Sequence, residues 1–222
     1  MFGRRRHRQE ETPAVAEETA RAPERESGPW DAEEPHPERE RVDLGGLRLP
    51  VGPGFEIQLN LAGDRIVGAI ALVDGSALQV QAFAAPKRSG IWDEVRAELV
   101  TAVRKAGGTA EEAQGPFGTE LLAKVPGEEG PQQVRYLGVD GPRWFLRAVI
   151  SGRAAQEAAA AAVLEDVVRD IVVVRGDEPM PPHEPIELRL PPEARQAADR
   201  QAAGTAPDLN PFRRGPEIAE IR

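Results

Sequence analysis

The 222 residues carry a formal net charge of -9 and include 21 prolines, 22 glycines, three histidines and no cysteine. This length suits one domain, and the acidic balance argues against a body that binds nucleic acid through a positive surface. The missing cysteine excludes disulfides and thiolate metal sites and fits a reducing compartment, so we expect a cytoplasmic protein. No stretch reaches the ~18 apolar residues of a transmembrane helix, so no membrane contact is expected.

Residues 1–43 are rich in Glu, Pro and Arg and hold few large apolar side chains. Such a segment cannot bury enough apolar surface to offset the entropy lost on ordering, so we expect a disordered, charged tail. A basic tip precedes an acidic run, without the apolar segment of a signal peptide. The tip either contacts nucleic acid or is a solvated start neutralised by its acidic neighbours. Its basic residues are Arg4, Arg5, Arg6 and Arg8.

Residues 44–175 carry the patterns of a folded domain. Its first segments either alternate apolar and polar residues or are apolar almost throughout, and turns with glycine separate them. Such short turns predict neighbouring antiparallel strands, which together form a meander. The predicted strands are 55–61, 65–73 and 77–84.

The second part of the domain begins with an apolar stripe at helical spacing. It predicts a helix over 91–106, with Ser89 as its N-cap and Trp92 anchoring it to the sheet. A second helix begins near Ala154, and a β-branched run predicts a last strand over 171–174. Four more strands lie between the helices, and the last two form the most aromatic hairpin of the chain. These strands are 109–114, 119–125, 133–139 and 143–150.

This order of elements predicts a single α+β domain. Short connections between strands favour a mostly antiparallel sheet of about seven to eight strands with two packed helices. Prolines recur through 176–222, so we expect a Pro-rich extended tail with a short exposed helix. Residues 186–190 alternate and suit an edge strand. Near the chain end, three residues form a candidate docking element for the body or a partner: Phe212, Arg213 and Arg214.

Three blocks of sequence are distinctive together: GPFGTEL at 115–121, GVDGPRWFLR at 138–147 and VVVRGDEPMPP at 172–182. With the Asn-Pro-Phe ending at 210–212, they resemble the actinobacterial family known as domain of unknown function 3710. The resemblance runs from about Leu44 onward and implies a cytoplasmic setting, but no established activity and no catalytic residues. The architecture is also similar to the Mog1/PsbP-like sandwich, whose members are commonly non-catalytic accessory or binding factors.

The residue types of the predicted domain disfavour catalysis. The histidines His7, His36 and His183 all fall in the predicted tails, and no phosphate-binding, dinucleotide-binding or nucleophile-elbow motif is present. Acidic pairs lack the spacing of a calcium loop, so we predict no metal site and no cofactor. We assign no catalytic residue and favour a non-enzyme, with a hydrolase or lyase that uses carboxylates alone as the enzymatic alternative.

The strand that follows the Asp-Gly-Pro turn is the best binding candidate. Strand alternation places Arg143, Phe145 and Arg147 on one face and Trp144 in the core, and Arg135 joins from the next strand. This face either binds an acidic peptide of a protein partner, stacks on nucleic acid, or lies under a helix or tail. We therefore predict a non-enzymatic adaptor or protein-binding module. The alternative is a nucleic-acid-associated factor, and the oligomeric state is left open.

Overall fold

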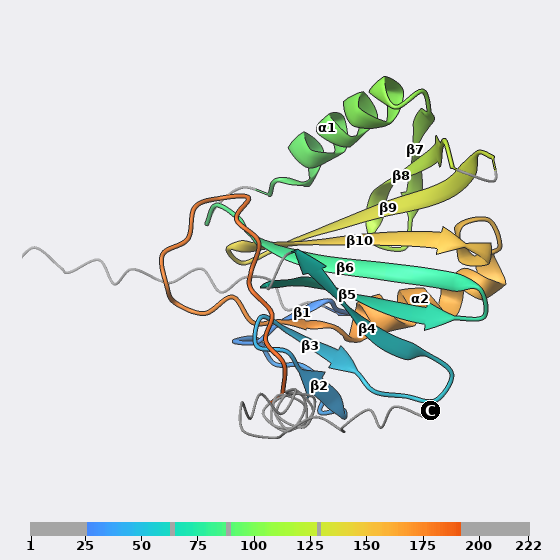
Figure 1. Ribbon diagram of the computed structural model, residues 1–222. Coiled ribbons are helices and arrows are strands. Elements are labelled where there is room, and N and C mark those ends of the chain that lie inside the picture. The colour runs from blue at the N-terminus through green and yellow to red at the C-terminus, as the bar shows by residue number, and fades with distance from the viewer. Residues whose placement is uncertain (1–25, 63–64, 88–89, 128–129, 192–222) are drawn as a thin grey trace, which may run out of the picture.

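The computed structural model (Figure 1) describes residues 26–62, 65–87, 90–127 and 130–191 of the chain. These residues form a seven-stranded sheet, a four-stranded sheet and two α-helices. The predicted α+β class, with its largely antiparallel sheet and two helices, is confirmed.

The large sheet has the strand order β4-β5-β6-β10-β9-β8-β7, and every neighbouring pair is antiparallel. The predicted meander and the four later strands all appear in it. At the β5–β6 turn Asp74 and Gly75 both have positive φ, the backbone that a two-residue hairpin turn requires. The strands are β4 (Glu56–Ala62), β5 (Arg65–Val73), β6 (Ser76–Ala84), β7 (Thr109–Gly115), β8 (Gly118–Val125), β9 (Gln132–Gly141) and β10 (Trp144–Gly152).

The small sheet has the order β1-β11-β3-β2. Its members are β1 (Trp30–Asp31), β2 (Arg41–Asp43), β3 (Leu47–Pro50) and β11 (Val172–Val173), the last within the predicted strand at 171–174. Two of these strands come from 1–43, which the sequence predicts to be a tail. They form because distant partners complete them: β1 pairs with β11, and buried Asp31 accepts a hydrogen bond from Trp144 Nε1 at 2.5 Å.

The helices lie on opposite faces of the large sheet. Helix α2 (Ala158–Asp170), which follows a short 3-10 turn η1 (Arg153–Ala155), buries Leu164 in the main core with Leu146 of β10. Helix α1 (Trp92–Lys105) packs Trp92 on Phe145 in a second, smaller core. Because successive strand residues point to opposite faces, Leu146 and Phe145 place α2 and α1 on different sides. Figure 1 shows α1 beside β7 and β8, at the end of the sheet far from β4.

The start of α1 is fixed by the sheet. The backbone N–H groups of Ile91 and Trp92 donate to the two carboxylate oxygens of Asp140 on β9, at 2.8 and 3.4 Å. The first N–H groups of a helix have no partner within it, so this carboxylate acts as a cap from a distant strand. The predicted cap, Ser89, lies outside the described residues. Trp92 anchors α1 to the sheet as predicted, and its Nε1 donates to the Thr119 carbonyl at 2.7 Å.

A segment we call the C-terminal strap, residues 183–189, extends the body beyond the predicted boundary at 175. Pairing of β5 with β6 stops at Ala69 and Val80, and the strap passes between the two strands where they diverge. Ile186 N–H donates to the Ala82 carbonyl at 2.9 Å, and Leu188 N–H donates to the Ile66 carbonyl at 3.1 Å. The side chains of Ile186 and Leu188 are both buried. The strap therefore lies inside the sheet layer, whereas the sequence suggests an edge strand there.

Candidate functional site

Arg135 lies on the α2 face of the large sheet, away from Arg147. In the β9–β10 register Arg135 stands opposite Ile150, whereas Arg147 stands opposite Gly138. Ile150 is fully buried in the main core, and it is three positions from Arg147 along β10, so the two side chains point to opposite faces. The prediction that Arg135 shares a face with Arg147 is therefore wrong. The register between β9 and β10 decides on which side Arg135 lies, and the local sequence does not fix that register.

Arg135 belongs to a buried ion network that joins α2 to the sheet. Its Nη2 donates to Glu120 of β8 at 2.8 Å and to Glu165 of α2 at 2.9 Å. Burial alone lowers the pKa of the Arg135 guanidinium, but the hydrogen bonds and charges of Glu120 and then Glu165 raise it overall. All three side chains are at most 15% exposed. The network holds two packed layers together, and it neutralises the two buried carboxylates that acid–base chemistry would need.

Arg143 does not continue the alternation of β10. It precedes the strand, in the turn, with a φ of 59°. Its Nη2 donates to the Gly176 carbonyl at 3.2 Å and lies 3.6 Å from the carboxylate of Asp177. A left-handed residue breaks the alternation of side chains, so the expected place of Arg143 beside Phe145 and Arg147 is corrected. The contacts of Arg143 with Gly176 and Asp177 instead join two of the distinctive sequence blocks, 138–147 and 172–182.

Phe145 is covered, as one of the alternatives for this strand face expects. The ring is 1% exposed and stacks between Trp92 of α1, at a centroid distance of 5.8 Å, and Phe83 of β6, at 6.1 Å. Gly138 makes this possible, since a Cβ there would stand 2.1 Å from the Trp92 indole. The face is therefore closed by α1 at Phe145, and the aromatic stack forms a wall beside the next residue on that face.

Arg147 is the member of the predicted face that remains accessible. It is half-buried, its Nη2 donates to the Gln81 side-chain carbonyl, and its guanidinium lies 5.2 Å from the centroid of the Phe83 ring. Burial lowers the pKa of Arg147, and the nearby Tyr136 hydroxyl partly opposes this effect. Within the part of the chain that the structure describes, Arg147 forms no ion pair with a carboxylate.

The surroundings of Arg147 form what we call the open face of the large sheet. Buried and half-buried residues alternate along the whole of β6, so one side of the strand packs in the core and the other is accessible. The cross-strand register extends this accessible side over β5, β9 and β10. Its half-buried members are Ile70, Leu72, Gln79, Gln81, Phe83, Tyr136, Arg147 and Val149.

Sequence reasoning misses the residues that surround Arg147 on the open face. The alternation of Gln79, Gln81 and Phe83 with the buried residues of β6 is visible in the sequence. It could have indicated an accessible strand face. The sequence does not show that β6 pairs with β10. This pairing places Gln81 directly opposite Arg147, although 66 positions separate the two residues.

The remaining predicted features divide between described and undescribed residues. The basic tip Arg4 to Arg8 and the docking element Phe212 to Arg214 lie outside the described residues. His36 and His183, expected in tails, lie within the described part, where His183 Nε2 is 3.8 Å from a carboxylate oxygen of Glu94. In the described ranges, no three His, Asp or Glu side chains gather as a metal ion would require. No helix there has the length and apolar character needed to cross a membrane.

Of the comparisons with known proteins, the one with family models found a match. A family model described as a protein of unknown function, DUF3710, matches residues 28–197. This match begins close to β1 and extends past the C-terminal strap, so it includes both sheets and both helices. No curated protein and no solved structure matches the chain. The likeness to the Mog1/PsbP-like sandwich therefore stays a prediction.

Proposed function

The chain belongs to the DUF3710 family, and we propose that it is a non-enzymatic binding module that takes an acidic segment of a partner protein on the open face. The observation that carries the proposal is the half-buried Arg147 guanidinium, which has Gln81 and Phe83 beside it and no carboxylate within the described residues. Because the chain has no cysteine, we place this role in the reducing cytoplasm of an actinobacterium, the setting that the family resemblance implies.

The contrast with two other arginines supports this reading of Arg147. Arg41 donates to Asp170 at 2.7 Å, and Arg135 is bound by two carboxylates, so the fold neutralises both of these buried guanidinium groups. Arg147 is partly desolvated without such compensation, which makes the empty state unfavourable. A carboxylate supplied by a ligand would form a charge-assisted hydrogen bond there, and the low local dielectric would strengthen it.

The rest of the open face suits a peptide with both acidic and apolar residues. Phe83 and Tyr136 flank Arg147, and Ile70 and Val149 add half-buried apolar surface nearby. Arginine and aromatic residues are enriched at the centres of protein interfaces, where they carry most of the binding energy. The side chains of Gln79 and Gln81 on β6 can form hydrogen bonds with the backbone of an extended ligand. A nucleic acid would meet the same arginine, but it carries a phosphate at every nucleotide, and Arg147 is the one basic residue among the named members of the open face.

The test is a binding titration with two probes. Fluorescence anisotropy would compare a labelled peptide of glutamates around one phenylalanine with a labelled single-stranded oligonucleotide of similar length. We expect the peptide to bind the natural chain, and Arg147→Gln to weaken binding by at least about tenfold, since a hydrogen bond to a charged group contributes roughly 1.5–3 kcal/mol. Arg147→Lys should retain part of the affinity.

The matched control is Arg153→Gln, which removes an exposed arginine that pairs with Glu157 on the short turn η1. It changes the net charge by the same amount, so unspecific attraction of the probe would respond equally to both variants. Equal losses for Arg147→Gln and Arg153→Gln would contradict the proposal. Preferential binding of the oligonucleotide that depends on Arg147 would replace the acidic peptide with nucleic acid as the ligand.

A further inference from the structure

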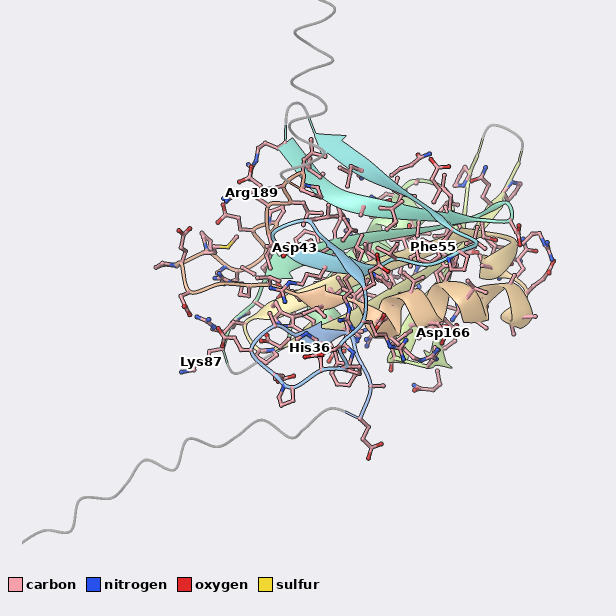
Figure 2. The ribbon with its side chains drawn as sticks, turned by 90° about the horizontal axis from the view of Figure 1, so that it is seen from below. His36, Asp43, Phe55, Lys87, Asp166 and Arg189 are labelled. Carbon is pink, nitrogen blue, oxygen red and sulfur yellow. The ribbon has the colours of Figure 1, made fainter. Side chains whose placement is uncertain are left out.

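A groove runs between α2 and the strands of the small sheet, on the side of the molecule away from the open face. It has a volume of about 300 Å³, and its second wall consists of residues 39–40 just before β2, the end of β3 and the loop before β4. Val51 on one wall and Val163 on the other are 52% and 45% exposed. They are the exposed large apolar side chains in the described part of the chain, and they face one groove. Figure 2 shows α2 next to the small sheet, with Phe55 and Asp166 labelled beside the helix.

The groove combines this apolar floor with acidic edges. Phe55 and Val167 add apolar lining, while the exposed Glu40 stands on the strand wall and Asp166, whose side chain is 76% exposed, stands on α2. Of the 28 basic and 37 acidic residues in the chain, 17 and 27 lie within 26–191, which gives this part a net charge of -10. Arg39 also lines the groove and lies 3.7 Å from Asp170, and Arg169 lies 2.7 Å from Asp166. Solvent-exposed pairs of this kind contribute little, so Asp166 can still bind a further cation, and Glu40 forms no ion pair within the described residues. An apolar side chain followed by positive charge is therefore the complementary occupant.

The chain itself contains such a segment beyond the described residues. Leu209 and Phe212 are two large apolar residues three positions apart, and Arg213 and Arg214 follow directly. The basic tip at the other end also holds Phe2, but an acidic run from Glu10 separates it from the body and would be repelled by the acidic edges. The C-terminal segment thus matches both properties of the groove.

The tether is long enough for this contact. The strap ends beside the small sheet, where Arg189 N–H donates to the Leu44 carbonyl at 2.7 Å. The chain from residue 191 to Phe212 can span up to about 70 Å when extended. A folded body of this size has a radius of gyration of about 15 Å, so the groove is within reach. Joining the two sites in one chain gives an effective concentration of up to about the millimolar range, so a contact with a dissociation constant well below that would be largely formed.

We infer that residues 208–214 of the chain dock in this groove, with Phe212 between Val51 and Val163 and the two arginines at the Glu40 and Asp166 edges. The docking covers the exposed valines and ties the C-terminal end of the chain to α2. It is separate from the proposed binding of an acidic ligand, because the groove and the open face lie on opposite sides of the large sheet.

The test uses the absence of cysteine, which lets two introduced cysteines report proximity in the full chain. One replaces Gly215 next to the docking arginines, and the other replaces Ala162, an exposed α2 residue one turn before Asp166. A short bismaleimide should cross-link Ala162→Cys to Gly215→Cys at least about tenfold faster than a control pair. The control places the body cysteine at Glu98, an exposed position on α1, with the same tail cysteine.

Further variants separate the proposal from its alternatives. Phe212→Ser lies outside the described body and cannot unfold its core, and it should reduce the Ala162 pair to the control rate. Val163→Ser, at an exposed site, should have the same effect with an unchanged circular dichroism spectrum. Equal rates for the Ala162 and Glu98 pairs would overturn the inference. A rate that rises with protein concentration would overturn it in favour of docking between copies, and faster cross-linking from Gly3→Cys would assign the groove to the other end of the chain.

Discussion

Asp140 of β9 accepts a hydrogen bond from the backbone N–H of Ile91 at 2.8 Å, although 49 positions separate the two residues. The same carboxylate receives the Trp92 N–H, so one side chain fixes where α1 begins and how it meets the sheet. Trp92 then reaches Phe145, and Phe145 with Phe83 forms the wall beside Arg147. The cap therefore positions the aromatic edge of the open face as well as the helix.

Removing this cap should destabilise the protein measurably. We expect Asp140→Ala to lower the free energy of unfolding by about 1–2 kcal/mol, the range for loss of a helix-capping side chain, in a urea titration. Asp140→Asn keeps an oxygen acceptor and should lose less. Asp93→Ala, which removes an acid that is 93% exposed in the first turn of α1, is the matched control and should change stability by less than about 0.5 kcal/mol. Similar losses for Asp140→Ala and Asp93→Ala would assign the effect to charge near the helix end.

The C-terminal strap should behave as part of the folded core. Leu188 is 3% exposed, and its backbone N–H donates to the Ile66 carbonyl at the start of β5. Leu188→Ala should therefore lower the free energy of unfolding by about 2–4 kcal/mol, the usual result of truncating a buried leucine. Val163→Ala removes a valine that is 45% exposed and should have little effect. If both variants unfold at the same urea concentration as the natural chain, the strap does not contribute to the core.

The elements of the large sheet could be predicted because their signals are local. The alternation of β6 and the helical stripe of α1 each depend on neighbouring residues, and the strands and helices appear within a few positions of the predicted bounds. β1 and β2 could not be found in this way, because two or three residues carry no alternation, and they become strands only through β11 and β3. Composition indicates a tail there, and tertiary pairing overrides it.

The candidate site was predictable in part for the same reason. Alternation within β10 correctly separates Trp144, which is fully buried, from Arg147, which is accessible. The places of Arg135 and Arg143 depend on the register of β9 with β10 and on a left-handed turn residue, and neither has a signal in local alternation. Gln81 joins Arg147 only because β6 and β10 are neighbours in the sheet.

The ion network around Arg135 should be strongly destabilised when its cation is removed. Arg135→Met leaves Glu120 buried without a counter-charge, while Glu165 keeps only Arg169, at 3.7 Å. We expect a loss of about 3–5 kcal/mol in the free energy of unfolding. Adding Glu120→Gln and Glu165→Gln to this variant removes the uncompensated charges and should recover most of the loss. A chemical denaturation series over the two variants measures both effects. No recovery in the triple variant would show that packing of the arginine stem, and not charge, dominates.

In contrast to Arg135, Arg147 should contribute to ligand binding and slightly lower the free energy of unfolding. Its pKa is lowered in the folded chain by burial, so the charged form is less favourable there than in the unfolded chain. A basic group with a lowered pKa destabilises the folded state at every pH at which it stays charged, which for arginine includes the whole neutral range. Arg147→Met removes that charge, together with its contact over the Phe83 ring and its hydrogen bond to Gln81, and keeps a long apolar side chain at the position. Because the side chain is still partly exposed, we expect a modest gain of about 1 kcal/mol or less in the free energy of unfolding.

The same variant should lose the affinity for the glutamate-rich peptide. A residue that is selected for packing would show the reverse pattern, since its replacement lowers stability and affects binding only through unfolding. Urea titration and peptide anisotropy on one preparation of Arg147→Met therefore distinguish the two roles. A loss of stability of more than about 1 kcal/mol would assign Arg147 to the fold through its bond to Gln81. Retained stability with lost binding would leave ligand recognition as the reason for an unneutralised arginine on the open face.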